Sequence, residues 1–181
     1  HAHSDELLAS LAALVRIPSV EGAPEEGAPF GKEPARCLHE MLALCEKLGF
    51  PTENMDDRVG WCEYGEGEEM VAVLGHLDVV PAGDGWTESE PFSGEIKNGR
   101  IYGRGTMDDK GPMVAAVYAL ATLKQSGFQP SRRIRVIFGT NEETGCGDMA
   151  WYASHGGEMP VMGFTPDGEY PLINGEKGIL N

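Results

Sequence analysis

Apolar residues recur at the three-to-four-residue spacing of a helix in several stretches of the chain. From Leu7 to Val15 they form one stripe, and Ile17-Pro18-Ser19 ends this element. A second stripe runs from Pro34 to Leu48. The pattern predicts helices at about residues 4–15, 34–48, 111–126 and 148–154.

Short apolar runs between turn residues predict strands among these helices. Met70–Leu74 is almost wholly apolar, which is typical of a strand that is buried on both faces. Further strands are predicted at Trp61–Tyr64, Ile134–Gly139 and Val161–Phe164, whereas the glycine-rich residues 81–104 are predicted to form loops and hairpins. The alternation of helices with apolar strands indicates an α/β fold, with a mixed, largely parallel sheet covered by helices on both faces.

The charge of the chain excludes some classes of partner. Its 29 Asp and Glu residues outnumber its 14 Lys and Arg residues, and the formal net charge is −15. Because this excess repels polyanions, we expect no nucleic-acid partner and no anionic membrane surface. The surplus favours solubility, or it marks carboxylates that are gathered to hold cations.

Cysteine usage and hydropathy indicate a reducing, cytoplasmic setting. The four cysteines include no C-x-x-C pair, so they form neither a convincing disulfide framework nor a zinc knuckle. No stretch reaches the roughly 18 consecutive apolar residues of a membrane span, and the chain opens on an amphipathic helix and not on a signal peptide. We therefore expect no membrane partner.

Residues that can bind metals follow the predicted strands. His76 and Asp78, Glu142 and Glu143, and Asp167 each come shortly after one of these apolar runs. In open α/β sheets the ligand crevice lies beyond the carboxyl ends of the strands. These side chains could therefore converge on one site, although they are far apart in sequence.

Each of these motifs also has an ordinary explanation when it is taken alone. His76 and Asp78 point the same way on an extended backbone, which suits an imidazole ligand and a carboxylate that orients it, but H-x-D is a weak signal. Asp108-Asp109 precedes a predicted helix, where acidic residues often act as caps. Adjacent surface glutamates usually have no special role, yet in Glu142-Glu143 one could bind metal while the other acts as general base.

The same residues belong to four longer motifs that follow one another along the chain. These are Gly75–Pro81 (GHLDVVP), Gly103–Gly111 (GRGTMDDKG), Asn141–Gly145 (NEETG) and Phe164–Asp167 (FTPD). In sequence and order they resemble the M20 metallopeptidases, and within that family the bacterial dipeptidases of the PepV type. The likeness extends to Gly175–Gly178 and implies a zinc-exopeptidase-like fold.

The resemblance implies a site for two divalent metal ions. Asp108 would bridge the ions, His76 and Asp167 would complete the protein ligands of one, and Glu143 would bind the other. The peptide bond between Asp108 and Asp109 is expected to be cis. Zinc is the expected metal, and manganese or cobalt would also suit imidazole and carboxylate ligands.

The resemblance also implies two catalytic residues. Glu142 would be the general base on a water activated by both ions, and Asp78 would orient or polarise His76. The implied reaction is the hydrolysis of a dipeptide or another small amide. The alternatives are an N-acyl amino acid deacylase, such as a desuccinylase or aminoacylase, and a metal-binding domain without catalysis.

Members of this family use a further His ligand and a lid domain, both supplied further along the chain. Residues 1–181 are therefore expected to be the N-terminal portion of a catalytic domain, without the lid or dimerisation domain and the C-terminal portion. One metal site would be tighter than the other. His39 and His155 do not match the missing ligand and are expected to be exposed or structural. The sheet would present an exposed edge, with self-association as the consequence.

Overall fold

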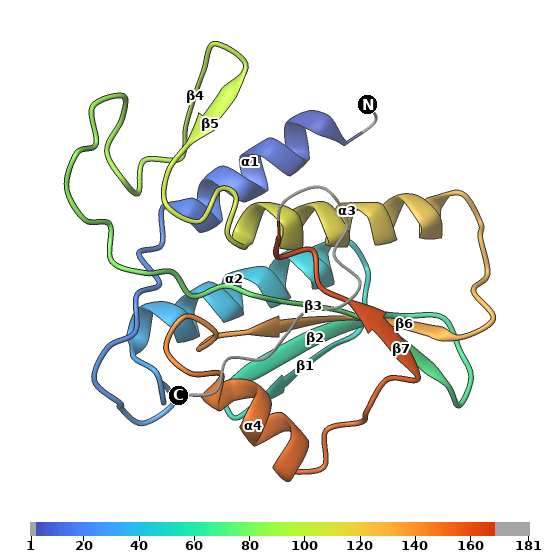
Figure 1. The fold of residues 1–181 in the computed structure, drawn as a ribbon. Coiled ribbons are helices and arrows are strands. Elements are labelled where there is room, and N and C mark those ends of the chain that lie inside the picture. The colour runs from blue at the N-terminus through green and yellow to red at the C-terminus, as the bar shows by residue number, and fades with distance from the viewer. Residues whose placement is uncertain (1–2, 169–181) are drawn as a thin grey trace.

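A five-stranded mixed sheet lies at the centre of the structure, a computed structural model in which residues 3–168 are described (Figure 1). The strands lie in the order β1-β2-β6-β3-β7. Their bounds are Thr52–Met55 (β1), Val59–Tyr64 (β2), Met70–His76 (β3), Arg133–Gly139 (β6) and Met162–Phe164 (β7). Strand β2 is antiparallel to β1 and β6, whereas β3 is parallel to β6 and β7, so β2 runs opposite to the other four. The predicted mixed, largely parallel sheet is confirmed.

Helices cover both faces of this sheet, as predicted (Figure 1). Helices α1 (Ser4–Val15), α2 (Lys32–Lys47) and α3 (Lys110–Gln125) pack on one face, and α4 (Gly147–Ser154) packs on the other. Because successive side chains of a strand point to opposite faces, Val136 and Phe138 join the core under the first three helices. Ile137, between them, packs with Tyr152 of α4.

Three parts of the fold differ from the sequence pattern or refine it. Strand β1 was not predicted, because its sequence, Thr-Glu-Asn-Met, has no apolar run and its residues stay largely exposed at the edge of the sheet. Within the glycine-rich stretch 81–104, β4 (Glu95–Lys97) and β5 (Arg100–Tyr102) form the expected hairpin. Helix α2 begins two residues before Pro34, since proline is tolerated in a first turn.

Strand β7 forms an exposed, apolar edge. It pairs with β3 at three positions, and its Met162 and Phe164 side chains are 59% and 58% exposed. Apolar hollows of about 380 and 450 Å³ lie beside it, and Phe164 lines both. The expected exposed edge is therefore present. The Gly175–Gly178 motif lies outside the described residues.

Two further observations concern the described residues as a whole. None of the helices within residues 3–168 combines the length and the apolar character needed to cross a membrane. The four cysteines are all unpaired, and three of them, Cys37, Cys45 and Cys62, are buried.

Candidate active site

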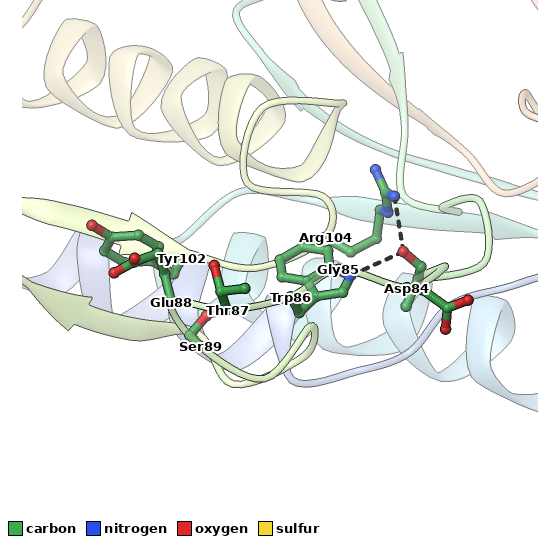
Figure 2. A pocket seen from close by; sticks show the side chains of 9 residues that line it. Asp84, Gly85, Trp86, Thr87, Glu88, Ser89, Tyr102 and Arg104 are labelled. Carbon is green, nitrogen blue, oxygen red and sulfur yellow. Dashed lines mark hydrogen bonds between the residues drawn. The ribbon is translucent and has the colours of Figure 1, made fainter.

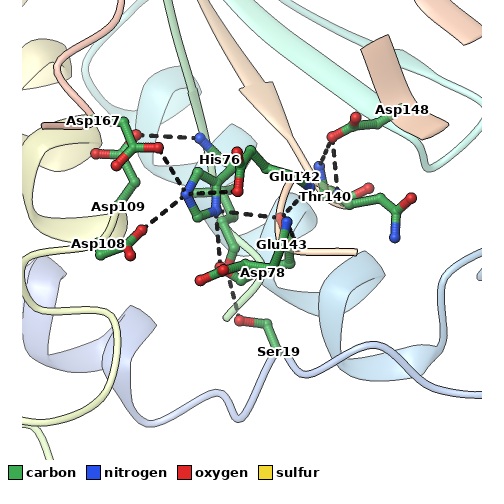
Figure 3. Close-up of polar contacts among 12 residues, drawn as sticks. Ser19, His76, Asp78, Asp108, Asp109, Thr140, Glu142, Glu143, Asp148 and Asp167 are labelled. Atoms are coloured by element: carbon green, nitrogen blue, oxygen red, sulfur yellow. Dashed lines mark hydrogen bonds and ion pairs between the residues drawn. The ribbon is translucent and has the colours of Figure 1, made fainter. Parts of the chain in front are cut away.

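His76 is the last residue of β3 and lies where the sheet meets the loops that follow its strands (Figure 3). The ring is 1% exposed, and its Nδ1 donates to the backbone oxygen of Asp78 at 3.0 Å. The other ring nitrogen, Nε2, is buried and has no hydrogen-bond partner. An imidazole held in this way directs the lone pair of Nε2 towards a ligand, which is the arrangement of a metal-binding histidine.

Carboxylates from three separate parts of the chain surround His76 Nε2 (Figure 3). Asp108 Oδ1 lies 3.0 Å from it, in the loop before α3, and Asp167 Oδ2 lies 3.3 Å from it, after β7. Glu142 Oε2, after β6, lies at 3.8 Å. The fold therefore brings together residues that the sequence separates by up to 91 positions, counted from His76 to Asp167.

Asp78 has a wider role in the geometry than the sequence indicated. Its Oδ1 lies 3.4 Å from His76 Nδ1, consistent with the expected orienting role. The same carboxylate also accepts the backbone N–H of Glu142 on Oδ1 and that of Glu143 on Oδ2, each at 3.1 Å. Asp78 thus fixes the glutamate pair relative to the imidazole.

Asp109 is a site residue that the sequence analysis did not assign. It is fully buried, and its Oδ2 accepts the backbone N–H of His76 at 3.3 Å. Its side chain makes no capping hydrogen bond to α3, so the capping explanation of the acidic pair is wrong for this residue. The peptide bond between Asp108 and Asp109 is cis, as the family resemblance implied. A Cβ on Gly75 would lie 2.0 Å from Asp109 Oδ2, so this contact requires glycine.

The described side chains form two groups of three whose ligand atoms all lie within 4.8 Å of one another. One contains His76, Asp108 and Glu143, and the other contains His76, Asp109 and Asp167. His76 belongs to both groups, but it offers only Nε2 because Nδ1 is already bonded. The orphaned nitrogen and the mixed oxygen and nitrogen donors fit a borderline divalent ion such as zinc.

The site carries more negative charge than its own residues compensate. Burial disfavours the charged form of His76, but the hydrogen bond and charge of Asp78, with Asp109 and Asp167, raise its pKa to about 10. Burial, and then the charge of Asp167, raise the pKa of Asp109 to about 7. A bound cation would replace protons at these positions.

The glutamate pair occupies a turn that a second buried carboxylate holds in place. Asp148 Oδ2 accepts the backbone N–H groups of Thr140 and Asn141 at 2.7 and 2.9 Å. Burial raises the pKa of Asp148, and it also raises those of Glu142 and Glu143. The sequence showed Asp148 only as the start of a helix, so its anchoring role was missed.

A hollow of about 410 Å³ lies apart from these ligands, in the stretch between Asp78 and Asp108 (Figure 2). Trp86 Nε1 and Arg104 Nη2 both donate to the backbone oxygen of Ala82, at 2.9 and 3.3 Å. None of the predicted metal-binding residues lines this hollow. The candidate metal site is therefore located by the close approach of its potential ligand atoms and not by the size of a cavity.

His39 and His155, which were not assigned to the site, lie elsewhere on the surface. His39 Nε2 lies 2.6 Å from Asp57 Oδ1, and His155 stacks on Trp151 with 3.5 Å between ring centroids. Both side chains are exposed, as expected.

Comparison with protein families identifies the group to which these features belong. The family model described as peptidase family M20/M25/M40 matches residues 72–181. This chain belongs to that family. The match begins in β3 and includes all six residues predicted for the site, so the resemblance seen in the four motifs is confirmed.

The similar curated proteins are dipeptidases or putative dipeptidases. A putative dipeptidase, YtjP, of Bacillus subtilis (strain 168) is 48% identical over 179 residues, which cover 98% of this chain and 38% of the relative. The Beta-Ala-Xaa dipeptidase of Lactobacillus delbrueckii subsp. lactis is 44% identical over 183 residues, covering 99% and 38%. The chain thus spans 38% of the length of these relatives.

Solved structures show the same fold. Human carnosine dipeptidase 1 superposes with a TM-score of 0.75 at 24% identity, covering 93% of this chain and 40% of that protein. The M20 family metallo-carboxypeptidase Sso-CP2 from Sulfolobus solfataricus gives 0.70 at 22% identity, covering 91% and 38%. At these identities the likeness establishes the architecture and not the substrate.

Proposed function

We propose that this chain carries the metal-binding and proton-transfer residues of a metallodipeptidase that uses two divalent ions. The observation that carries the proposal is the buried Nε2 of His76, which has no hydrogen-bond partner and faces Asp108 and Asp167 at 3.0 and 3.3 Å. A protein interior seldom leaves such a nitrogen unpaired among acids unless a ligand completes the arrangement.

The residues present fit a two-ion site. Asp108 is the proposed bridging ligand, with His76 and Asp167 on one ion and Glu143 on the other. The two groups of three described above contain all four of these residues, which supports their role as ligands, and they add Asp109, which is buried beside Asp167. When bound, the ions would polarise the scissile carbonyl and acidify the attacking water. Zinc suits these donors best, and manganese or cobalt remain compatible.

Glu142 is the proposed general base. Its carboxylate is half-exposed beside His76 Nε2, where it can accept a proton from water and pass it to the leaving amine. Its raised pKa, caused first by burial, favours that exchange. Asp78 fixes the backbone of Glu142 and holds the Nδ1 proton of His76, so it positions base and ligand together.

Dipeptides are the proposed substrates, since relatives at 48% and 44% identity carry dipeptidase names. An M20-type N-acyl amino acid deacylase uses the same metal chemistry and is the alternative reaction. Rates for the full-length protein on unblocked dipeptides and on N-acyl amino acids distinguish the two. Faster hydrolysis of the N-acyl compounds would overturn the dipeptidase assignment.

Residues 1–181 are proposed to be the N-terminal portion of the catalytic domain. The coverage of 38% of each relative supports this, and it leaves room for a further His ligand, a C-terminal portion and a lid or dimerisation domain. In the 181-residue chain alone, one metal site would therefore be weaker than the other. Equal and tight occupancy of both sites would contradict this division.

The test of the site is metal stoichiometry by plasma mass spectrometry, after dialysis against trace zinc or manganese. We expect the chain to bind one or two ions and Asp108→Ala to lose them. Asp84→Ala, which removes an exposed carboxylate outside both ligand groups, is the matched control and should retain them. Wild-type protein without bound metal would refute a site formed by these residues. The same result would also refute the alternative that the chain is a metal-binding domain without catalysis.

Self-association through the β7 edge is a separate proposal for the 181-residue chain. The exposed Met162 and Phe164 side chains support it, as does the edge position of β7, whose outer backbone pairs with no strand within residues 3–168. Phe164→Lys should shift the sedimentation coefficient of the chain towards that of a monomer. A wild-type chain that sediments as a monomer at all concentrations would overturn it.

A further inference from the structure

Lys110 is fully buried, although an ammonium group normally remains in water. Its Nζ donates to the backbone oxygens of Leu14 and Ile17, at 3.0 and 2.7 Å. Both oxygens lie at or just beyond the C-terminal end of α1, where carbonyl groups lack helical partners and the helix dipole is negative. The first residue of α3 therefore supplies the positive group for the end of α1.

Ser19 connects the same segment to the other side of the site. It too is fully buried, and its Oγ donates to the backbone oxygen of Leu77 at 2.6 Å. Its own backbone oxygen accepts the N–H of Val79 at 3.1 Å. Leu77 and Val79 are the neighbours of Asp78, so residues 14–19, here called the bridging segment, hold the backbone on both sides of that carboxylate.

The bridging segment thus joins the two loops that carry the proposed ligands. One end is held by Lys110, which directly follows the Asp108-Asp109 pair. At the other end, Ser19 holds the loop after His76 (Figure 3). The loops also approach each other at Gly105, where a Cβ would lie 3.0 Å from Lys110 Cδ and from Val79 Cγ1. A change at Lys110 or Ser19 would therefore alter the separation of the ligands without removing one.

We propose that Lys110 and Ser19 are positioning residues that act through the bridging segment to set the metal affinity of the site. The inference rests on the proposed function, because it takes divalent ions as the ligand. Metal binding requires donor atoms at fixed separations, so a small displacement between the loops weakens it. A merely structural role would lower the stability of the fold and leave the affinity of the folded protein unchanged.

The test is a titration of the metal-free full-length protein with cobalt, followed by its visible absorption. We expect Lys110→Met and Ser19→Ala each to weaken cobalt binding by about 10–100-fold and to change the spectrum at saturation. Arg135→Met is the matched control, because it removes another buried cation that hydrogen-bonds at the opposite ends of the strands. It should lower the melting temperature and leave cobalt affinity and spectrum unchanged.

The double variant shows whether the two residues act through one segment. Because Lys110 and Ser19 hold opposite ends of it, losing both should weaken binding about as much as the larger single change. If the loss of cobalt affinity in the double variant equals the product of the two single losses, the residues act independently. That result would overturn the shared bridging role. If Lys110→Met does not fold, Ser19→Ala decides alone, and unchanged cobalt affinity in that variant overturns the inference.

The failure of the proposed function would look different. Wild-type protein that binds no cobalt would refute the metal site itself. Wild-type protein that binds cobalt, with both single variants within about twofold of it, would leave the metal site intact and refute the positioning role alone.

Discussion

Two clusters of charged residues lie at opposite ends of the same central strands, and they are built differently. At the beginning of β6, Arg133 and Arg135 contact Glu63 of β2 and Glu158 after α4; we call these four the paired cluster. Arg135 donates to Glu63 at 2.8 Å and to Tyr152 Oη at 2.9 Å. Each charge there has an opposite charge beside it.

The cluster beyond the carboxyl ends of β3 and β6 lacks that balance. The single imidazole, that of His76, lies close to the carboxylates of Asp108, Glu142 and Asp167. His76 Nε2 and Asp109 Oδ1 are buried without hydrogen-bond partners. Burial raises the pKa of Glu142 there, whereas hydrogen bonds from Arg133 lower the pKa of Glu158 in the paired cluster. The same strands therefore carry one cluster whose charges are paired and one with unpartnered buried polar atoms, as the proposed metal site requires.

The largest expected difference between the clusters concerns catalysis. Replacing Glu142 by Gln removes the proposed base, so kcat for a dipeptide should fall by about 10²–10⁴-fold while the metal content stays that of the wild type. Steady-state rates and plasma mass spectrometry on the full-length protein measure both. Glu66→Gln, in an exposed turn, is the control with an unchanged rate. Activity that survived the change at Glu142 would remove it as the base.

A smaller effect is expected at Asp78. In Asp78→Asn the amide keeps one acceptor but cannot accept both backbone N–H groups of Glu142 and Glu143. Metal affinity should therefore fall by about 10–100-fold, as competition with a chelator would measure. Glu63→Gln makes the same chemical change in the paired cluster and should leave that affinity unaltered. Equal losses in both variants would mean that the two clusters do not differ in this respect.

Removal of the buried arginine should affect stability alone. Arg135→Met removes one of the two arginines that donate to Glu63, leaves Tyr152 Oη without its charged donor and ends the cation–π contact with Trp61 at 4.8 Å. The free energy of unfolding should fall by about 1.5–3 kcal/mol in urea titrations. A variant as stable as the wild type would show that the paired cluster makes no net contribution.

The smallest effect is expected at Glu158, and it depends on pH. Hydrogen bonds from Arg133 lower its pKa in the folded state below the ordinary 4.5, so its stabilisation is present above pH 4.5. That stabilisation is lost as the pH falls through the lowered folded-state value. Glu158→Gln should cost less than about 1 kcal/mol at pH 7 and flatten the decline of melting temperature with acid. Parallel declines in the two proteins would argue against pairing in solution.

The sequence by itself determined much of the fold. The apolar stripes of α1 to α4 and the apolar run of β3 are local patterns, because a helix or strand must repeat its buried positions at its own period. The family also followed from local motifs, and the comparisons confirm it. The roles of His76, Asp78, Asp108, Glu142, Glu143 and Asp167 came from that resemblance and remain predictions.

The tertiary structure alone decided how these residues are supported. Strand β1 forms because its backbone pairs with the edge of β2. The polar sequence of β1 does not by itself predict a strand. Asp109, Asp148 and Lys110 were missed because their partners, His76, Thr140 and Leu14, are respectively 33, 8 and 96 residues away. A buried charge is specified by what the fold places around it, so its role cannot be deduced from its neighbours in sequence.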